Sequence, residues 1–380
     1  MKIAIVSTAY PYRGGIAQYT GILTARLRAR GHEVVVLTFQ RQYPKFLFPG
    51  KSQLENDQND SFRIDSERIL DSIGPWTWFT AGRRLRSFGP DLILFKFWMP
   101  FFAPCFGTLC WLVKRHLDSK IVYICDNVIP HEKRLGDIAL TRYAFKHADG
   151  FVVQSHVVEK DLLSLYPDAT YRYVPHPVYY IFGDILPKES ARTKLGIDDE
   201  RVILFFGYVR KYKGLDLLLQ AMPDILCNVN VKLMVVGEFY EDEAGFKKII
   251  ADFDIGDRVS VCARFVPSEE VGKYFSAADV VVLPYKSATQ SGIVQLAYHF
   301  NKPCIVTDVG GLAEVVIEGK TGYVVRPNDA GAIARAVVQF YAENKESTFS
   351  ENVKTEKQKY SWDHMLDALE ELANASPGNS

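Results

Sequence analysis

Three basic side chains crowd one short loop of this 380-residue chain. Arg210, Lys211 and Lys213 follow the apolar run at 202–206 and precede a helical pattern that begins at Gly214. Cations this close repel one another, so a bound anion such as a phosphate explains their grouping better than packing does. The alternative is a basic turn that meets only solvent. The pattern predicts an anion-binding loop between a strand and a helix.

A second loop lies within SATQSGIVQ at 287–295 and carries hydroxyls, amides and a glycine but no carboxylate. It follows the apolar run at 280–283, and an apolar pattern at helical spacing begins after Gly292. The N–H groups at a helix start attract anions, which makes Ser291, Gly292 and Ile293 candidates for binding one. The alternative is that Ser291 and Gly292 form an ordinary helix cap.

The first loop of the chain contains a glycine pair, Gly14 and Gly15, ahead of a long helical pattern that extends to about Arg30. Two glycines let backbone N–H groups approach a ligand without obstruction by side chains, and the helix start favours an anion there. The alternative is a simple turn.

One histidine candidate lies in the loop CDNVIPHEK at 125–133, after the apolar run at 121–124. His131 either orients substrate hydroxyls or is an ordinary polar loop residue. His131 and Glu132 begin like the zinc motif HExxH, but Leu135 occupies the place of the second histidine, so we predict no zinc site.

Short apolar runs alternate with longer stretches of helical period along almost the whole chain. The runs lie at 3–6, 34–37, 92–95, 121–124, 151–153, 202–206, 233–236, 259–261, 280–283, 304–306 and 323–325. Continuous apolar strands separated by helices predict parallel sheets covered on both faces, which is an α/β fold of doubly wound, Rossmann-like domains. The dinucleotide fingerprint GxGxxG follows none of these strands.

A stretch near 175–197 is rich in proline and aromatic residues and lacks a helical period. We therefore predict an N-terminal domain at 1–180, a C-terminal domain at 197–355 and a last amphipathic helix at about 360–374. Residues 1–180 hold 23 Lys and Arg against 16 Asp and Glu, a net charge of +7, whereas 181–380 hold 22 against 29, a net charge of −7. This asymmetry suggests different partners for the two domains, unless surface charge varies freely.

Composition excludes the disordered and fibrous classes, because 48% of the residues are hydrophobic and 24% are charged. The six cysteines form no CxxC pair and are expected to be small core residues in a reducing compartment. The N-terminus opens as a strand and does not have the layout of a signal peptide. These features predict a cytoplasmic protein.

Four segments together resemble the retaining, GT-B-fold glycosyltransferases of family 4. They are GGIAQYT, GYVRKYKGLDLLLQA, VVGE and SGIVQLAYHFNKPCIVTDVGGLAEVVIEGKTGYVV. The resemblance implies that the N-terminal domain receives the acceptor, the C-terminal domain binds a UDP- or GDP-sugar, and the last helix packs back on the N-terminal domain. It also implies transfer of a hexose-type sugar in the synthesis of cell-envelope polysaccharides or glycoconjugates.

The resemblance also marks a departure, because family members commonly carry two glutamates in the SATQSG loop and in the helix that follows it. Their places fall on Ala288 and Leu296 here, so both carboxylates are missing. The helix start at 291–293 then remains for the donor diphosphate. Gln290 and Gln295 are the nearest candidates for sugar and ribose hydroxyls.

Further roles follow from the resemblance alone. The family places a basic pair against the diphosphate, and Lys213 matches one of its positions directly. The usual arginine position is Tyr208 here, and Arg210 is expected to supply that charge from two positions on. Arg264 and Phe265 are expected near the nucleotide base. Asp126 stands where many relatives have a histidine, so it becomes, with His131, a candidate for the acceptor side.

The mechanism implied by the resemblance needs no metal and no cofactor, because the nucleotide-sugar is itself a substrate. The acceptor hydroxyl attacks the face from which the diphosphate leaves and passes its proton to a phosphate oxygen. Asp252 and Asp254 imitate the metal-binding DxD motif of the other major glycosyltransferase fold, but they follow a helix at the wrong edge of the sheet.

One uncharged stretch concerns the acceptor. Residues 97–113 carry no charge, but Pro100, Pro104 and Gly107 interrupt them, so we expect no membrane-spanning helix. The stretch either packs in the core or, beside Lys114 and a basic domain, meets an anionic membrane and a polyprenyl-linked acceptor. No nucleic-acid partner is predicted. The alternatives are a nucleotide-sugar 2-epimerase of the same fold and an inactive scaffold.

Overall fold

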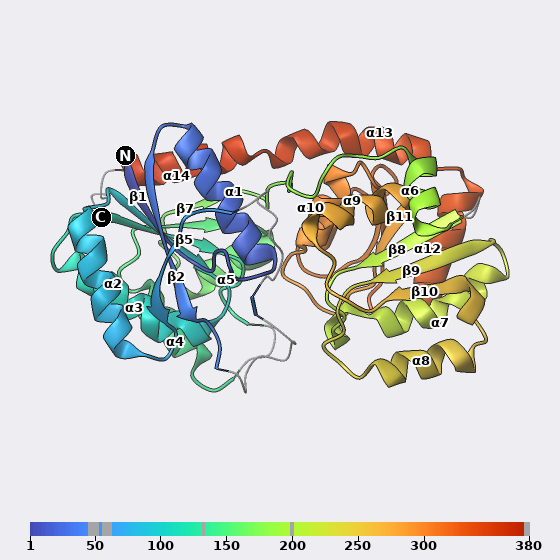
Figure 1. Cartoon of the computed structure of the whole chain (residues 1–380), viewed down its shortest axis with the longest axis horizontal. Helices are drawn as coiled ribbons and strands as arrows, with labels where there is room; N and C mark the ends of the chain where they lie inside the picture. The colour runs from blue at the N-terminus through green and yellow to red at the C-terminus, as the bar shows by residue number, and fades with distance from the viewer. Residues whose placement is uncertain (45–52, 55–62, 131–133, 198–200, 376–380) are drawn as a thin grey trace. The chain divides into compact units, whose positions relative to one another are not determined.

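The computed structural model describes residues 1–44, 53, 54, 63–130, 134–197 and 201–375. The chain divides into two compact units, which we call unit 1 and unit 2 (Figure 1). Unit 1 contains Met1–Pro177 together with Ser361–Ser380, and unit 2 contains Val178–Tyr360.

Unit 1 is built on a parallel sheet with the strand order β3-β2-β1-β4-β5-β6-β7. Its strands are β1 (Lys2–Val6), β2 (Glu33–Arg41), β3 (Glu67–Asp71), β4 (Leu92–Phe97), β5 (Lys120–Cys125), β6 (Gly150–Val153) and β7 (Tyr171–Tyr173). β1 lies beside β4, with Ile3 opposite Leu92. The predicted apolar runs become the inner strands, because both faces of a parallel sheet are buried. The two edge strands, β3 and β7, are polar and were not predicted.

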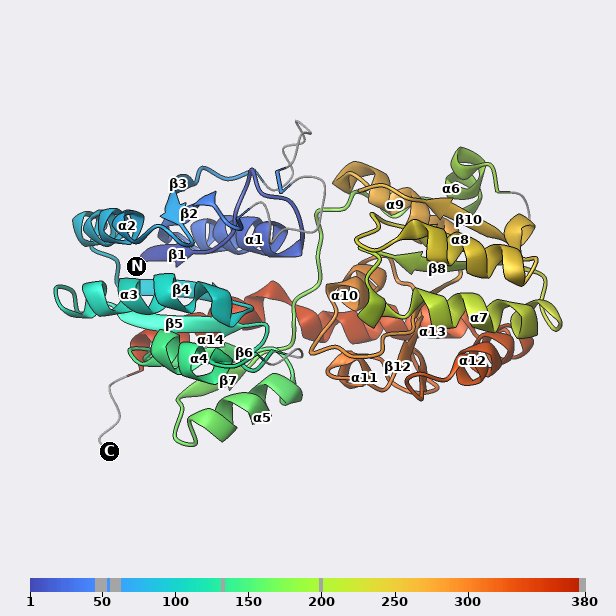
Figure 2. The same cartoon turned by 90° about the horizontal axis from the view of Figure 1, so that it is seen from below.

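Helices cover both faces of this sheet, as Figures 1 and 2 show. They are α1 (Gly15–Ala29), α2 (Pro75–Phe88), η2 (Pro100–Phe102), α3 (Ala103–Lys114), α4 (Asp137–Phe145), α5 (His156–Leu165) and α14 (Trp362–Asn374). α2, α3, α4 and α5 contribute to one large buried cluster on one face. α14 packs against α1, β5, β6 and β7.

Unit 2 has a second parallel sheet with the order β10-β9-β8-β11-β12-β13. Its strands are β8 (Arg201–Phe206), β9 (Val231–Val236), β10 (Val259–Cys262), β11 (Val280–Leu283), β12 (Cys304–Thr307) and β13 (Gly322–Val325). Every one of them contains a predicted apolar run. Two doubly wound α/β units confirm the predicted fold class.

The helices of unit 2 pack on both faces of its sheet. They are α6 (Lys188–Leu195), η3 (Lys211–Lys213), α7 (Leu215–Leu226), α8 (Glu243–Asp252), η4 (Gly256–Arg258), α9 (Ser268–Ala277), α10 (Gly292–His299), α11 (Leu312–Val315), α12 (Ala330–Ala342), α13 (Glu346–Glu356) and η5 (Lys357–Tyr360). α7 and α12 pack together, as do α6 and α9.

Two details differ from the expectations. The stretch near 175–197 is not wholly irregular, because α6 forms within it and joins unit 2 through its contact with α9. The sequence of α6, KESARTKL, is mostly polar and shows no clear apolar period, so the helix was not predicted. It is stabilised by tertiary contact. In addition, Cys227 is exposed rather than in the core.

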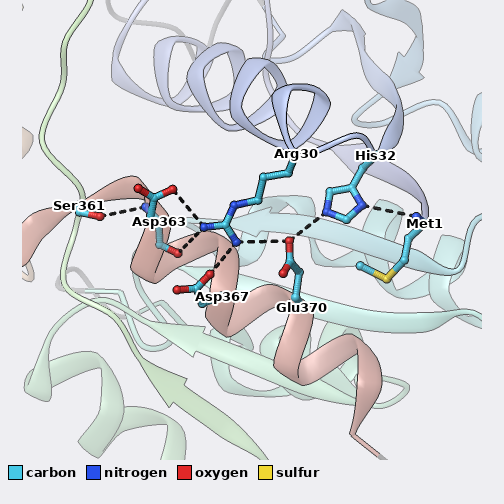
Figure 3. Close-up of polar contacts among 7 residues, drawn as sticks. All are labelled: Met1, Arg30, His32, Ser361, Asp363, Asp367 and Glu370. Carbon is cyan, nitrogen blue, oxygen red and sulfur yellow. Dashed lines mark hydrogen bonds and ion pairs between the residues drawn. The ribbon is translucent and has the colours of Figure 1, made fainter.

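The last helix is tied to unit 1 by a cluster of charged groups (Figure 3). The Arg30 guanidinium, at the end of α1, donates to Asp363 at 3.0 Å, Asp367 at 2.6 Å and Glu370 at 3.3 Å. His32 Nε2 lies 3.0 Å from Glu370 Oε1. These contacts hold one face of α14 against the end of α1.

The chain crosses between the units twice. The Val178 N–H donates to the Tyr360 carbonyl at 3.0 Å, so the outgoing and returning segments run side by side. Within unit 1, the Tyr19 ring contacts His176 and Trp362, with ring centroids 5.3 and 4.9 Å apart. The same buried tyrosine therefore packs against both segments.

Candidate functional site

The strand order of unit 2 reverses between β8 and β11, and the carboxyl ends of such strands are where α/β proteins hold ligands. The loops after these two strands are joined there. The Lys286 N–H donates to the Tyr212 carbonyl at 2.6 Å. Gly214 has a φ of 68°, and a Cβ on it would lie 2.0 Å from the Pro284 carbonyl oxygen. Only glycine lets the basic loop approach the end of β11 this closely.

Lys213 is the buried cation of this junction, with 7% of its surface exposed. Its ammonium lies 5.4 Å from the ring centroid of Tyr285, and 2.9 Å from the point that a Cβ on Gly207 would occupy. Among the described residues no carboxylate pairs with it and no acceptor receives a hydrogen bond from it. Burial, and then the nearby charge of Arg210, lowers the pKa of Lys213 to about 7. A buried ammonium without a counter-ion is costly, so this position is suited to an anionic ligand.

The other two cations of the loop differ from Lys213. Arg210 is half-buried and lies over the Tyr240 ring at 4.8 Å from its centroid, with no carboxylate paired to it in the described parts of the chain. Lys211 is exposed, and its backbone N–H donates to Glu241. The interpretation as a solvated basic turn therefore fits Lys211 but not Lys213.

The start of α10 faces the same edge of the sheet. Ser291 is its N-cap, and the Ser291 Oγ accepts from the Ile293 N–H at 3.3 Å. Ser291 thus acts as a helix cap, and the Ile293 amide already donates to that cap. The Gly292 N–H makes no hydrogen bond within the described structure, so this amide remains available.

The places of the missing glutamates are apolar and buried, since Ala288 is 8% and Leu296 is 3% exposed. Gln295 is 1% exposed, and its Oε1 has no hydrogen-bond partner in the described residues. A buried amide oxygen without a partner is unusual in a native protein, which makes Gln295 a stronger candidate for a ligand hydroxyl than its sequence position indicated. Gln290 is half-buried in the preceding loop.

Aromatic rings extend along the ends of the neighbouring strands. Tyr208 lies 4.7 Å from Tyr240 and 6.4 Å from Phe265, measured between ring centroids. Arg264, in contrast, points to α9 and pairs with Glu270 at 2.7 Å. Phe265 therefore belongs to a ring surface that could stack a nucleotide base, and Arg264 is already held by a carboxylate.

The candidates of unit 1 lie at the carboxyl edge of its own sheet. Gly14, with a φ of 103°, caps α1, which begins at Gly15. Asp126 directly follows β5, and its Oδ1 accepts a hydrogen bond from Lys96 Nζ at 2.6 Å. His131 lies outside the described residues. The predicted site residues are thus divided between the units, with Gly14, Gly15 and Asp126 in unit 1.

Three further residues shape these edges and were not predicted. Tyr285 accepts a hydrogen bond from the Ser291 hydroxyl at 3.3 Å and presents its ring to Lys213. Tyr240 packs against Arg210, and Lys96 holds Asp126. Of these three residues, only Lys96 could have been noticed from the sequence, because it is the one charged residue in the otherwise apolar strand LILFKF.

No group of three His, Cys, Asp or Glu side chains with the arrangement of a metal site occurs in the residues that the structure describes. In the same residues, no helix has the length and apolar character needed to cross a bilayer.

Two protein-family models match the chain. Residues 13–179 match Glycosyltransferase Family 4, and residues 187–357 match Glycosyl transferases group 1. An uncharacterized glycosyltransferase of Methanocaldococcus jannaschii is 26% identical and aligns over 96% of each chain.

Solved structures resemble the fold of this chain closely. Sucrose-phosphate synthase from Thermosynechococcus elongatus has a TM-score of 0.78 at 21% identity, covering 99% of this chain and 100% of that one. Anabaena HepE in complex with UDP and glucose has a TM-score of 0.76 at 16% identity, covering 98% of each chain. The two family matches cover most of each unit, and the chain belongs to the GT-B-fold glycosyltransferases of family 4.

Proposed function

We propose that the protein transfers a hexose-type sugar from a UDP- or GDP-sugar to a glycan or lipid-linked acceptor, with retention of configuration. The observation that carries this proposal is the buried ammonium of Lys213 at the strand-order reversal of unit 2, without a carboxylate partner in the described structure. A diphosphate supplies the counter-ion that this position lacks.

The chemistry of the departing diphosphate fits the groups around it. Negative charge grows on the phosphate oxygens as the glycosidic bond breaks, and Lys213, Arg210 and the Gly292 amide are the groups placed to stabilise it. Groups that are already fixed and partly desolvated need little reorganisation during the reaction. These three groups would act on the leaving group without a metal ion.

The apolar character of Ala288 and Leu296 is compatible with this mechanism. When the acceptor hydroxyl attacks the face from which the diphosphate leaves, a phosphate oxygen takes its proton, and the loop needs no basic carboxylate. Gln295 offers an amide oxygen to a hydroxyl of the nucleotide-sugar. The ring surface of Tyr208, Tyr240 and Phe265 offers a place for the base.

The relatives support the donor class. HepE, whose fold is shared, binds UDP and glucose in its solved structure. We extend that ligand class to this chain because unit 2 presents a cationic loop, a helix start and an aromatic surface on one sheet edge.

We further propose that the acceptor is membrane-borne and reached from the inner face of the plasma membrane. Most of 97–113 is buried, so core packing accounts for that stretch. Apart from Trp111, the exposed candidates lie elsewhere on unit 1. Trp76 and Phe79 are 84% and 42% exposed, and Arg83 and Arg86 continue the same face of α2 at helical spacing.

The neighbouring helix adds to this surface. Trp111 of α3 is 40% exposed, and the Arg115 guanidinium lies 4.5 Å from its ring centroid. Aromatic rings beside arginines are typical of surfaces that lie against anionic lipid headgroups. An acceptor with a polyprenyl anchor would be presented at such a surface.

A panel of UDP-glucose, UDP-galactose, UDP-N-acetylglucosamine and GDP-mannose tests the proposal in buffer that contains EDTA. We expect release of nucleoside diphosphate from at least one donor, faster with a lipid-linked acceptor fraction than without it. Isomerisation of the sugar in the absence of acceptor would instead show a 2-epimerase. Binding without any turnover would show an inactive scaffold.

A further inference from the structure

A lysine is buried in the centre of the unit 1 sheet. Lys96 stands near the end of β4, a strand that is otherwise apolar and fully buried, and only 3% of its surface is exposed. Placing an ammonium in an apolar interior is unfavourable unless partners surround it. An apolar residue of similar length would fill this position without that penalty.

Three partners enclose the Lys96 ammonium. It donates to Asp126 Oδ1 at 2.6 Å and to Gln154 Oε1 at 2.9 Å, and it lies 3.9 Å from the centroid of the Tyr19 ring. β4, β5 and β6 lie in this order in the sheet, so Lys96, Asp126 and Gln154 come from adjacent strand ends. Tyr19 belongs to α1. Burial lowers the pKa of Lys96, while the charge of Asp126 opposes that shift.

The two side chains of the Lys96–Asp126 ion pair differ in their exposure to solvent. The Lys96 side chain is 4% exposed, whereas the Asp126 side chain is 16% exposed and directly follows β5. The carboxyl ends of β4 and β5 lie next to the strand-order reversal between β1 and β4, which is the ligand-binding edge of such a sheet. The carboxylate thus reaches the edge while its ammonium stays inside.

Stability alone does not account for this arrangement. Replacing a buried ion pair by apolar residues is often neutral or stabilising, so such a pair is weak evidence for a structural purpose. The three contacts of Lys96 instead fix the direction of one Asp126 oxygen. A carboxylate with one oxygen fixed in this way has a defined orientation for a ligand.

We infer that Lys96 is a positioning residue, which holds the Asp126 carboxylate at the edge of unit 1 as an oriented hydrogen-bond acceptor for a sugar hydroxyl. The inference rests on the proposed glycosyl transfer and adds a residue to its machinery. Lys96 acts through Asp126 and does not itself touch the sugar. Because Lys96 balances its charge, Asp126 serves as an acceptor of a hydrogen bond rather than as a nucleophile.

Three variants of the full chain test this inference: Lys96→Met, Asp126→Asn and the double variant. Turnover is measured as nucleoside diphosphate release from the most active donor of the panel, and melting temperature is measured on the same preparations. Lys114→Met is the matched control, because Lys114 forms a 2.7 Å ion pair with Asp149 in the same unit, away from the carboxyl edge.

We expect Lys96→Met to lower turnover at least 30-fold, with less than a threefold change in UDP affinity. Asp126→Asn leaves Lys96 buried without its counter-ion and should lower both turnover and melting temperature. The double variant removes both charges and should recover the melting temperature but not the turnover. Lys114→Met should turn over donor at the wild-type rate.

A purely structural pair gives the opposite result, because turnover then recovers together with the melting temperature in the double variant. That recovery, or wild-type turnover in Lys96→Met, would overturn the inference. A wild-type chain that releases nucleoside diphosphate from no donor of the panel contradicts the proposed function itself, and the inference fails with it.

Discussion

The ammonium of Lys213 faces the ring of Tyr285 at 5.4 Å, across the junction of the loops that follow β8 and β11. Tyr285 is 2% exposed, and its hydroxyl accepts a hydrogen bond from the hydroxyl of Ser291, the N-cap residue of α10. One tyrosine therefore links the cation of the first loop to the helix start of the second. A diphosphate bound beside Lys213 would also lie close to the start of α10.

Diphosphate binding should weaken as the pH rises above 7. In the folded chain without ligand, the pKa of Lys213 is about 7, below its usual value of 10.5. Above pH 7 most of the amine is therefore neutral, and binding of an anion requires that it take up a proton. Linkage then lowers the affinity by up to tenfold for each pH unit between about 7.5 and 9. Burial raises the pKa of both Tyr285 and Tyr212, which face the same loop, so these phenols stay neutral in this window.

Calorimetry with UDP or GDP in buffers of different ionisation enthalpy measures this proton uptake. The same lysine makes folding depend on pH. Because the pKa of Lys213 is lower in the folded than in the unfolded chain, the free energy of unfolding of the wild type should rise between about pH 7 and 10.5. Lys213→Met should show neither the proton uptake nor this gain. A wild-type affinity that is independent of pH would contradict the assignment.

Gly214→Ala should destabilise unit 2 by at least about 2 kcal/mol, because the new Cβ meets the Pro284 carbonyl and the backbone is left-handed. Gly245→Ala is the matched control within α8, where a Cβ meets nothing within 4 Å. That change should stabilise the unit by about 0.5–1 kcal/mol. Urea denaturation compares the two variants, and similar effects of both would refute the close approach of the two loops.

Arg30→Ala should loosen α14 from unit 1, because the guanidinium contacts three carboxylates of that helix (Figure 3). We expect a loss of about 1–2 kcal/mol, larger at low salt, since hydrogen bonds between charged groups exceed ordinary ones. Arg172→Ala removes one exposed pair with Glu371 on the same helix and should cost less than about 0.5 kcal/mol. Equal midpoints in urea would contradict this role of Arg30.

The inner strands were predictable because burial on both faces demands continuous apolar runs, as in VVVL at 280–283. β3 and β7 were not, because an edge strand such as YRY is short and polar. α6 was missed for a related reason, since its sequence shows little apolar period and its stability comes from α9.

For the candidate site, the sequence predicted the residue types of each loop but not the contacts between distant loops. The charge of the loop at 210–213 was visible, but the burial of Lys213 depends on the approach of Gly214 to Pro284, seventy positions away. The pairing of Lys96 with Asp126 likewise depends on the neighbouring positions of β4 and β5 in the sheet. Contacts of this kind have no local sequence pattern.

Vesicle binding should depend on the charge of α2. The double variant Arg83→Glu/Arg86→Glu should bind anionic vesicles at least about tenfold more weakly, because each basic residue contributes about 1 kcal/mol near such a surface. Lys247→Glu/Lys248→Glu makes the same charge change on the exposed α8 of unit 2 and should have little effect. Sedimentation with phosphatidylglycerol vesicles at two salt concentrations measures both. Equal loss in the two variants would mean that net charge, not this surface, determines binding.

The most direct test of the nucleotide-sugar assignment is a calorimetric titration of UDP and GDP into the full chain in EDTA. The wild type should bind at least one of them with a Kd below about 100 μM. Lys213→Met should melt no lower than the wild type, because it removes an uncompensated buried charge, and should bind at least 30-fold more weakly. Lys211→Met, which changes the exposed neighbour, should bind like the wild type. Equal binding by wild type and Lys213→Met, or no binding of either nucleotide by the wild type, would contradict the account.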